Sequence, residues 1–238
     1  MPSKVAKAVK ILRTEGPMSL LEATKEYIEW RFLPDSANEY QSQRIQGTKQ
    51  RWEMIEQRLT TDDHSLLDIG CNIGELTSNA AEFGLLAFGM ETNSESVRIA
   101  RESHKIEGAS FMQYTLTPDN IHKLPETDVI FVLSVYHYWY REHGSDRAEE
   151  LLTTLGEKAN SKLFFEPASR QERYKRTSDV DITPPPIENL NKESIVDHNT
   201  NLLNRALGDE YEIELLGGTP RGDDEEGSRY LFLCEKIS

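Results

Sequence analysis

Short apolar runs alternate with amphipathic segments across the middle of the chain, and this alternation constrains the fold more than any other feature of the sequence. Each run has the length and composition of a strand buried in a parallel sheet, and the segments between them repeat apolar residues at helical spacing. The predicted strands are residues 65–69, 85–90, 110–114, 128–135 and 162–165, and the predicted helices are residues 75–83, 94–104 and 147–158. This pattern predicts an α/β fold whose parallel sheet carries helices on both faces.

The end of the chain breaks the alternation and predicts an antiparallel closure of the sheet. Residues 195–207 form a further predicted helix. Residues 211–216 and 229–235 predict two strands joined by a polar, glycine-containing loop, which is typical of a hairpin. The prediction is therefore a sheet of about seven strands with a C-terminal antiparallel hairpin.

The length of 238 residues suits one such domain with short additions. Residues 1–60 predict a helical N-terminal extension, and residues 61–238 predict the α/β domain. Residues 168–200 interrupt the rhythm of the domain with a basic cluster at 170–176 and three consecutive prolines at 184–186. We expect this stretch to be an insertion on the substrate side, where open α/β sheets bind their ligands.

The formal net charge of −14 disfavours a protein that wraps bare nucleic acid, because neutralising phosphates requires a basic face. The first sixteen residues depart from this balance, with four basic residues and one acidic residue on a predicted amphipathic helix. Such a helix can contact an anionic membrane peripherally. A solvated helix that caps the domain explains the same pattern more simply.

The cysteines and the apolar runs predict a location. No apolar run reaches the length of a membrane span. Cys71 and Cys234 lie far apart and form neither a disulfide framework nor a metal set, so we expect a reducing cytoplasm, including the inner face of its membrane. No spacing of Cys, His or acidic residues resembles a zinc or calcium site, and we expect no metal.

The turn after the first predicted strand is the strongest functional signal. Residues 67–77 read Leu-Asp-Ile-Gly-Cys-Asn-Ile-Gly-Glu-Leu-Thr. Gly70 and Gly74 suit a tight strand-to-helix turn that a ligand approaches closely, with Asp68 and free backbone N–H groups facing its polar end. Glu91 ends the next strand about twenty residues later, the spacing at which a carboxylate binds the two ribose hydroxyls of a nucleoside cofactor.

These residues resemble motif I of the class I methyltransferases that use S-adenosyl-L-methionine (SAM), and Glu91 resembles the ribose-binding acid of that family. The resemblance implies SAM as the cofactor and a Rossmann-like sheet in the order 3-2-1-4-5-7-6, with the seventh strand antiparallel. It places the adenine near Thr115 and Leu116, and a group for the SAM carboxylate near Arg44. The cofactor-binding residues that we predict are Asp68, Gly70, Cys71, Asn72, Gly74, Glu91, Thr115, Leu116, Ser134 and Arg44.

Two features resemble a narrower group, the RNA phosphate methyltransferases. Asn72 stands where many class I members have glycine, and these enzymes share the turn Gly-Cys-Asn-x-Gly-x-Leu-Thr. The Glu166-Pro167 pair at the end of the fifth predicted strand is also similar to theirs. Their longer acceptor signature is absent from residues 134–140.

The acceptor is expected near residues 134–140, which follow the fourth strand and are dense in aromatic side chains. His137 is a candidate catalytic base because a histidine pKa lies near neutral pH, and Glu166 is a candidate catalytic residue that orients the acceptor. Alternatively, the aromatic residues pack beneath the next helix. Arg221 and Arg229 could bind an anionic acceptor, although a hairpin turn and a surface arginine explain them more simply.

The sequence therefore predicts a SAM-dependent methyltransferase that acts on a small-molecule or glycan acceptor, either a sugar hydroxyl or the carboxylate of a hexuronic acid. The basic start of the chain and the Gly-Pro pair at 16–17 also resemble haloarchaeal glycan-pathway methyltransferases. Two alternatives stay open. One is a methyltransferase for an RNA end or base, and the other is a SAM-binding protein without catalytic activity.

Overall fold

A computed structural model of the chain describes residues 47–168, 192–221 and 224–237, with the side chains of 219–221 and 224–228 left aside. The chain divides into two compact units, Met1–Gln46 and Gly47–Ser238, and all described residues belong to the second. The predicted basic N-terminal helix and Arg44 lie outside the described residues. Most of the predicted insertion, residues 169–191, also lies outside them.

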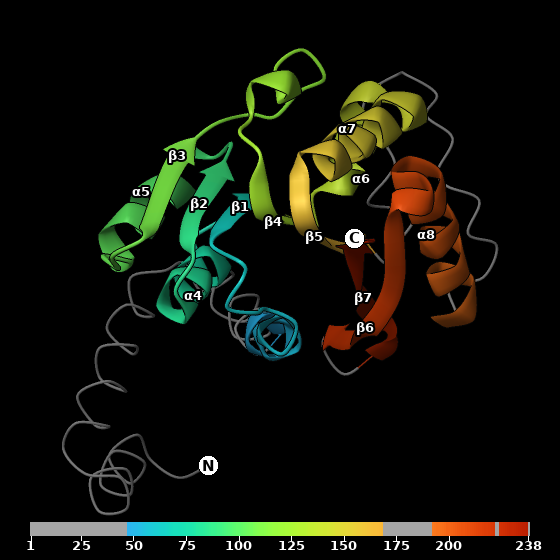
Figure 1. The fold of residues 1–238 in the computed structure, drawn as a ribbon, viewed down its shortest axis with the longest axis horizontal. Helices are drawn as coiled ribbons and strands as arrows, with labels where there is room; N and C mark the ends of the chain where they lie inside the picture. Colours follow the sequence, from blue (N-terminus) through green and yellow to red (C-terminus); the bar gives the residue numbers. More distant parts are fainter. Residues whose placement is uncertain (1–46, 169–191, 222–223, 238) are drawn as a thin grey trace, which may run out of the picture. The chain divides into compact units, whose positions relative to one another are not determined.

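Seven strands form one sheet in the order β3-β2-β1-β4-β5-β7-β6 (Figure 1). Strands β1 to β5 run parallel, and β7 runs antiparallel to both β5 and β6. This arrangement confirms the predicted strand order and the C-terminal hairpin. The strands are β1 Ser65–Ile69, β2 Leu86–Glu91, β3 Ala109–Gln113, β4 Thr127–Leu133, β5 Ala159–Glu166, β6 Tyr211–Arg221 and β7 Asp224–Lys236.

Helices cover both faces of this sheet, as predicted (Figure 1). They are residues 47–56, α4 Glu75–Phe83, α5 Ser94–Ser103, α6 Tyr136–His143, α7 Ser145–Lys158 and α8 Lys192–Leu207, with short 3-10 turns η1 Ile121–Lys123 and η3 Gly208–Glu210. Asn93 caps α5, since its side chain accepts hydrogen bonds from two backbone N–H groups of the first turn. Helix α6 was missed by the sequence analysis, although Tyr136, Trp139 and Tyr140 stand at helical spacing, because the segment is only eight residues long.

Consecutive residues of each central strand enter two different cores, because side chains alternate across a sheet. In β1, Leu67 joins the core beneath α7 and α8, while Leu66 joins the core beneath α4 and the helix of residues 47–56. Ile55 of that helix is fully buried. The segment just before β1 is therefore an integral part of the α/β unit, and it fixes the position of the residues that it carries.

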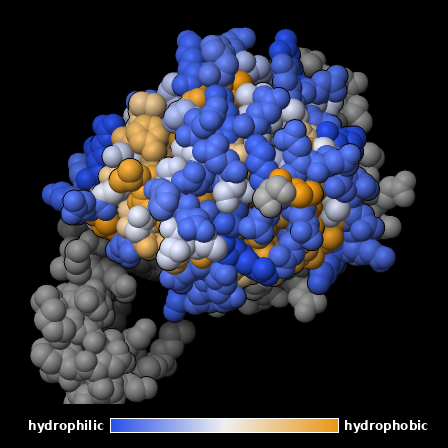
Figure 2. All heavy atoms as spheres, viewed as in Figure 1, coloured by the Kyte–Doolittle hydropathy of each residue, from blue (hydrophilic) through white to orange (hydrophobic). Residues whose placement is uncertain are grey.

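The described surface is largely hydrophilic on the face that Figure 2 shows. The large hydrophobic side chains that are exposed among the described residues are Phe83, Leu86, Tyr138 and Ile237. No described helix combines the length and the apolar composition that a bilayer crossing requires.

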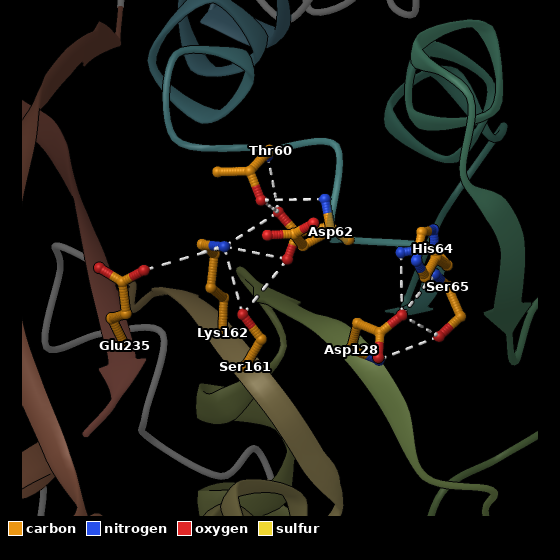
Figure 3. Close-up of polar contacts among 9 residues, drawn as sticks. Thr60, Asp62, His64, Ser65, Asp128, Ser161, Lys162 and Glu235 are labelled. Atoms are coloured by element: carbon orange, nitrogen blue, oxygen red, sulfur yellow. Dashed lines mark hydrogen bonds and ion pairs between the residues drawn. The ribbon is translucent and has the colours of Figure 1, made fainter. Parts of the chain in front are cut away.

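Polar side chains tie together the amino ends of β1, β4 and β5 (Figure 3). Lys162 Nζ lies 2.9 Å from both carboxylate oxygens of Asp63, and the two side chains are 5% and 1% exposed. Asp128 Oδ2 accepts hydrogen bonds from the backbone N–H groups of His64 and Ser65, at 2.9 and 3.0 Å. These contacts set the start of β1 against β4 and β5, at the edge opposite to the one where ligands are expected.

Candidate active site

The turn between β1 and α4 has the backbone geometry that its sequence predicts. Gly70, Asn72 and Gly74 have φ angles of 76°, 51° and 85°, all in the left-handed region. Asparagine tolerates this region better than other residues with a side chain, which explains how Asn72 replaces a glycine. A Cβ on Gly70 would collide with the Val135 side chain, and one on Gly74 would lie 2.5 Å from Phe111 Cε1. Both glycines are therefore required by the fold itself.

Glu91 fastens this turn to the carboxyl end of β2. Its Oε2 accepts a hydrogen bond from the Asn72 backbone N–H at 3.0 Å, and its Oε1 accepts one from the Asn93 N–H at 2.8 Å. The carboxylate is half-buried beside the turn, at the edge where a ribose is expected. Gly89, which the sequence analysis missed, also contributes, because a Cβ there would lie 2.8 Å from Cys71 Sγ.

Asp68 is the other acidic group of this turn and is almost fully buried. Burial raises its pKa to about 6, and the nearby charge of Glu91 adds to the rise. A hydrogen bond of 2.6 Å from Thr77 Oγ1 and the positive charge of Arg51 act in the opposite direction. A buried carboxylate in this state favours a positively charged ligand group.

Four side chains meet at the carboxyl ends of β4 and β5. Glu166, the last residue of β5, is fully buried, and its Oε2 lies 3.0 Å from Arg51 Nε. Ser134 Oγ donates to Glu166 Oε1 at 2.5 Å. Arg229 Nη1 donates to Ser134 Oγ at 2.5 Å and lies 3.3 Å from Glu166 Oε1. We call these four residues the arginine–glutamate cluster.

The cluster revises two expectations from the sequence. Arg229 was explained most simply as a surface arginine, but its side chain is only 19% exposed and pairs with Glu166. Arg51 was missed, because the predicted helix around it gives no sign that it pairs with a residue more than a hundred positions later. Arg221 belongs to the residues whose side chains are not described.

The other predicted residues lie in several different environments. Thr115 is exposed, while Leu116 is buried in the core beneath α7 and α8. Cys71 is buried in the turn, and burial raises the pKa of its thiol. His137 is 3% exposed on α6, and its ring lies 4.1 Å from that of the exposed Tyr138 between centroids, tilted by 37°.

The sequence analysis left two alternatives for the aromatic residues after β4: they line the acceptor site, or they pack in the core. Different residues fit different alternatives. Tyr136 and Trp139 are buried in the core and pack as the structural alternative predicts. Tyr138 is 46% exposed and is the member that faces solvent. Arg141 lies over its ring, at 4.9 Å from the centroid. Among the described residues, no group of His, Cys, Asp and Glu could hold a metal ion.

The sequence matches no protein-family model and no curated protein. Among solved structures, magnesium protoporphyrin IX methyltransferase from Synechocystis PCC 6803 with bound SAM is similar, with a TM-score of 0.54 at 15% identity over 80% of each chain. The bifunctional kinase-methyltransferase WbdD is also similar, with a TM-score of 0.55 at 19% identity over 81% of this chain. That match spans 39% of the WbdD chain. With its strand order and antiparallel β7, the chain has the fold of class I SAM-dependent methyltransferases.

Proposed function

We propose that the chain is a SAM-dependent methyltransferase that acts on a small-molecule or glycan acceptor, either a sugar hydroxyl or a hexuronic acid carboxylate. The observation that supports this most strongly is the glycine turn after β1, with Glu91 fastened to it and Asp68 buried beside it. Two carboxylates at this position suit a cofactor with cationic groups and a free ribose. They disfavour a cofactor with a ribose phosphate, because like charges repel.

The residues present fit SAM, and we assign them as follows. Glu91 would accept hydrogen bonds from the two ribose hydroxyls, and Asp68 would face the ammonium end. Backbone N–H groups of the turn, together with Cys71, would line the methionine part. Thr115 and Leu116 would lie near the adenine. Arg44 remains our candidate for the cofactor carboxylate, and Ser134 for the methyl end. When bound, SAM supplies an electrophilic methyl group.

The chain's own residues would align the acceptor and exclude water from it. A hydroxyl acceptor must lose a proton during transfer, and His137 is our candidate for the base that receives it. A carboxylate acceptor is already ionised at neutral pH and requires no base. The burial of His137 and the ion pairs of Glu166 support an aligning role for this region more than proton transfer.

The chemistry of the cysteines supports a reducing compartment for this reaction. Cys71 and Cys234 are both free and buried in the described structure. We therefore place the enzyme in the cytoplasm, where a lipid-linked sugar at the inner membrane face is also within reach.

Calorimetry with S-adenosylhomocysteine, the product form of the cofactor, tests the assignment. Glu91→Ala should weaken binding by about 1.5–3 kcal/mol, the scale of hydrogen bonds to a charged group. Glu95→Ala, which removes an exposed carboxylate from the adjacent helix α5, is the matched control and should bind normally. Equal affinities of the folded Glu91 variant and the wild type would remove Glu91 from the ribose site.

An RNA methyltransferase is the second candidate, and the turn containing Asn72 together with Glu166-Pro167 supports it. A catalytically inactive SAM-binding protein is the third. Methyl transfer to any acceptor would exclude the inactive protein.

A further inference from the structure

We propose that Thr77 is a positioning residue for the cofactor, whose hydroxyl directs the Asp68 carboxylate at the ammonium group of SAM. This inference rests on the proposed function and adds to it a residue that the sequence analysis did not single out. It concerns the amino-acid end of the cofactor, so it holds for any acceptor that is methylated.

Thr77 and Asp68 meet across the glycine turn. Asp68 lies in β1, before the turn, and Thr77 lies in the first turn of α4, after it. Thr77 Oγ1 donates a hydrogen bond of 2.6 Å to Asp68 Oδ2, and the two residues are 0% and 3% exposed. A hydrogen bond between groups this deeply buried is strong, because little water competes for either partner. It therefore fixes the orientation of the carboxylate.

The hydroxyl of Thr77 is used differently from that of the next residue, Ser78. Ser78 is also buried, at 2% exposed, and its Oγ donates to the Gly74 carbonyl oxygen at 2.7 Å, four residues earlier. This is a usual bond of a serine or threonine within a helix, and it acts on the helix alone. Thr77 instead donates to a side chain nine positions earlier, outside the helix. Its hydroxyl therefore acts on the ligand edge of β1.

Gly89 of β2 leaves the space that this hydroxyl occupies. A Cβ on Gly89 would lie 2.9 Å from Thr77 Oγ1 and 2.8 Å from Cys71 Sγ, so both side chains would have to move. Thr77 is also branched at its Cβ, which restricts its rotation. The packing of β2 therefore keeps the hydroxyl where it meets Asp68.

Thr77 satisfies only part of the Asp68 carboxylate. An ionised carboxylate has about four acceptor sites. Among the described residues, Thr77 is the only one that hydrogen-bonds to this carboxylate, and it does so at Oδ2. Glu91 and Arg51 act on Asp68 through their charges, which oppose each other. Burial raises the pKa of Asp68 to about 6, so a cationic ligand group beside the carboxylate would stabilise its ionised form.

Calorimetry on the full chain tests the proposal with two ligands that differ at the amino-acid end. S-adenosylhomocysteine carries the ammonium group, whereas 5′-methylthioadenosine keeps the adenosine and lacks the amino acid. Thr77→Val replaces the hydroxyl by a methyl group of similar size. It should weaken S-adenosylhomocysteine binding about 5- to 20-fold, because the carboxylate loses the hydrogen bond that orients it. Binding of 5′-methylthioadenosine should stay unchanged.

Three further variants separate positioning from a purely structural effect. Ser78→Ala removes the neighbouring buried hydroxyl and should leave the affinity for both ligands unchanged. Thr77→Ser keeps the hydroxyl and should restore most of the S-adenosylhomocysteine affinity that Thr77→Val loses. In an Asp68→Asn background, Thr77→Val should change this affinity less than about two-fold, because the hydroxyl then has no charged group to direct.

The wild type reports on the proposed function separately. A wild-type chain that does not bind S-adenosylhomocysteine would overturn the proposed function and this inference with it. If the wild type binds, unchanged S-adenosylhomocysteine affinity in folded Thr77→Val would overturn this inference alone. An equal loss of both ligands would also overturn it, because Thr77 would then only hold the turn. Should Thr77→Val not fold, Thr77→Ser and Thr77→Ala differ only in the hydroxyl, and equal S-adenosylhomocysteine affinities in these two would overturn the proposal.

Discussion

Asp68 shows how a single buried side chain makes the stability of the fold sensitive to pH. Its carboxyl group is 3% exposed, and Thr77 provides its hydrogen bond. The pKa of about 6 means that ionisation is unfavourable in the folded protein compared with the unfolded chain, where the ordinary value is 3.8. The folded state therefore loses stability as pH rises from about 4 through 6, and a cationic ligand group would restore it.

We expect Asp68→Asn to remove this pH dependence. Asparagine keeps the shape and can still accept the Thr77 hydrogen bond, but it has no charge to bury. Relative to the variant, the wild type should lose about 2.4 kcal/mol of unfolding free energy between pH 4 and pH 8. Urea unfolding at both pH values measures the difference, with the exposed Asp62→Asn as control. Parallel changes in wild type and Asp68→Asn would contradict the prediction.

Gly70 is required both for its left-handed backbone conformation and for the close packing around it, and a comparison with Gly208 separates the two effects. Gly70 and Gly208 have similar left-handed φ angles of 76° and 66°, but only Gly70 would bring a Cβ against a neighbouring side chain. Gly208→Ala should cost about 1 kcal/mol for backbone strain. Gly70→Ala should cost about 2–4 kcal/mol, because Val135 must also move, and it should abolish S-adenosylhomocysteine binding. Chemical denaturation and calorimetry measure both effects, and equal costs in the two variants would refute the close packing of the turn.

At the scale of elements, the amino edge and the carboxyl edge of the parallel strands carry different groups of polar side chains. The amino edge holds the buried Asp63–Lys162 pair, which joins the loop before β1 to β5 (Figure 3). The carboxyl edge holds the glycine turn and the arginine–glutamate cluster. Buried charges contact one another at both edges, and those at the carboxyl edge lie where open α/β sheets bind their ligands. A change at the amino edge should therefore affect stability rather than ligand binding.

Lys162→Met should destabilise the fold by about 3–5 kcal/mol, because it leaves Asp63 buried without its cationic partner. Arg147→Met breaks an exposed pair with Glu150 and should cost less than about 1 kcal/mol. The double variant Asp63→Asn/Lys162→Met should recover part of the loss, since no charge then remains buried. Urea unfolding gives the three free energies. A loss in Lys162→Met no greater than in Arg147→Met would show that the pair does not stabilise the fold.

At the scale of the whole molecule, the charge of −14 and the hydrophilic surface of Figure 2 bear on the nature of the acceptor. An acidic surface repels polyanions in general. A small acceptor with at most one negative charge meets little of this repulsion. An RNA chain carries a charge on every phosphate and would meet much more of it.

Salt dependence distinguishes these acceptors. Binding of a single-stranded RNA that neutralises several phosphates should weaken steeply with salt, with a slope of about −0.7 per phosphate in a plot of log K against log salt concentration. We expect binding of D-glucuronate, a hexuronic acid, to show a shallow slope and the RNA oligomer to bind weakly at every salt concentration tested. Tight RNA binding with a steep slope would favour the RNA methyltransferase instead.

The sequence by itself determined the α/β class, the C-terminal hairpin and the position of the glycine turn after β1, whereas the strand order followed from the resemblance to class I methyltransferases. The class and the turn depend on local patterns: buried strands are apolar, helices repeat at 3.6 residues, and a tight turn needs glycine. The carboxylates Asp68 and Glu91 were also found from the sequence, because their positions relative to strand ends are fixed by short stretches of chain.

Only the tertiary structure decided how Arg51, Ser134, Glu166 and Arg229 are related. Their contacts join residues separated by up to 115 positions, in a sheet where some neighbouring strands are far apart in the sequence. A pattern read along the chain carries no information on which side chain pairs with which across the sheet. The pairing follows from the packing of the helix before β1 and from the antiparallel insertion of β7 beside β5.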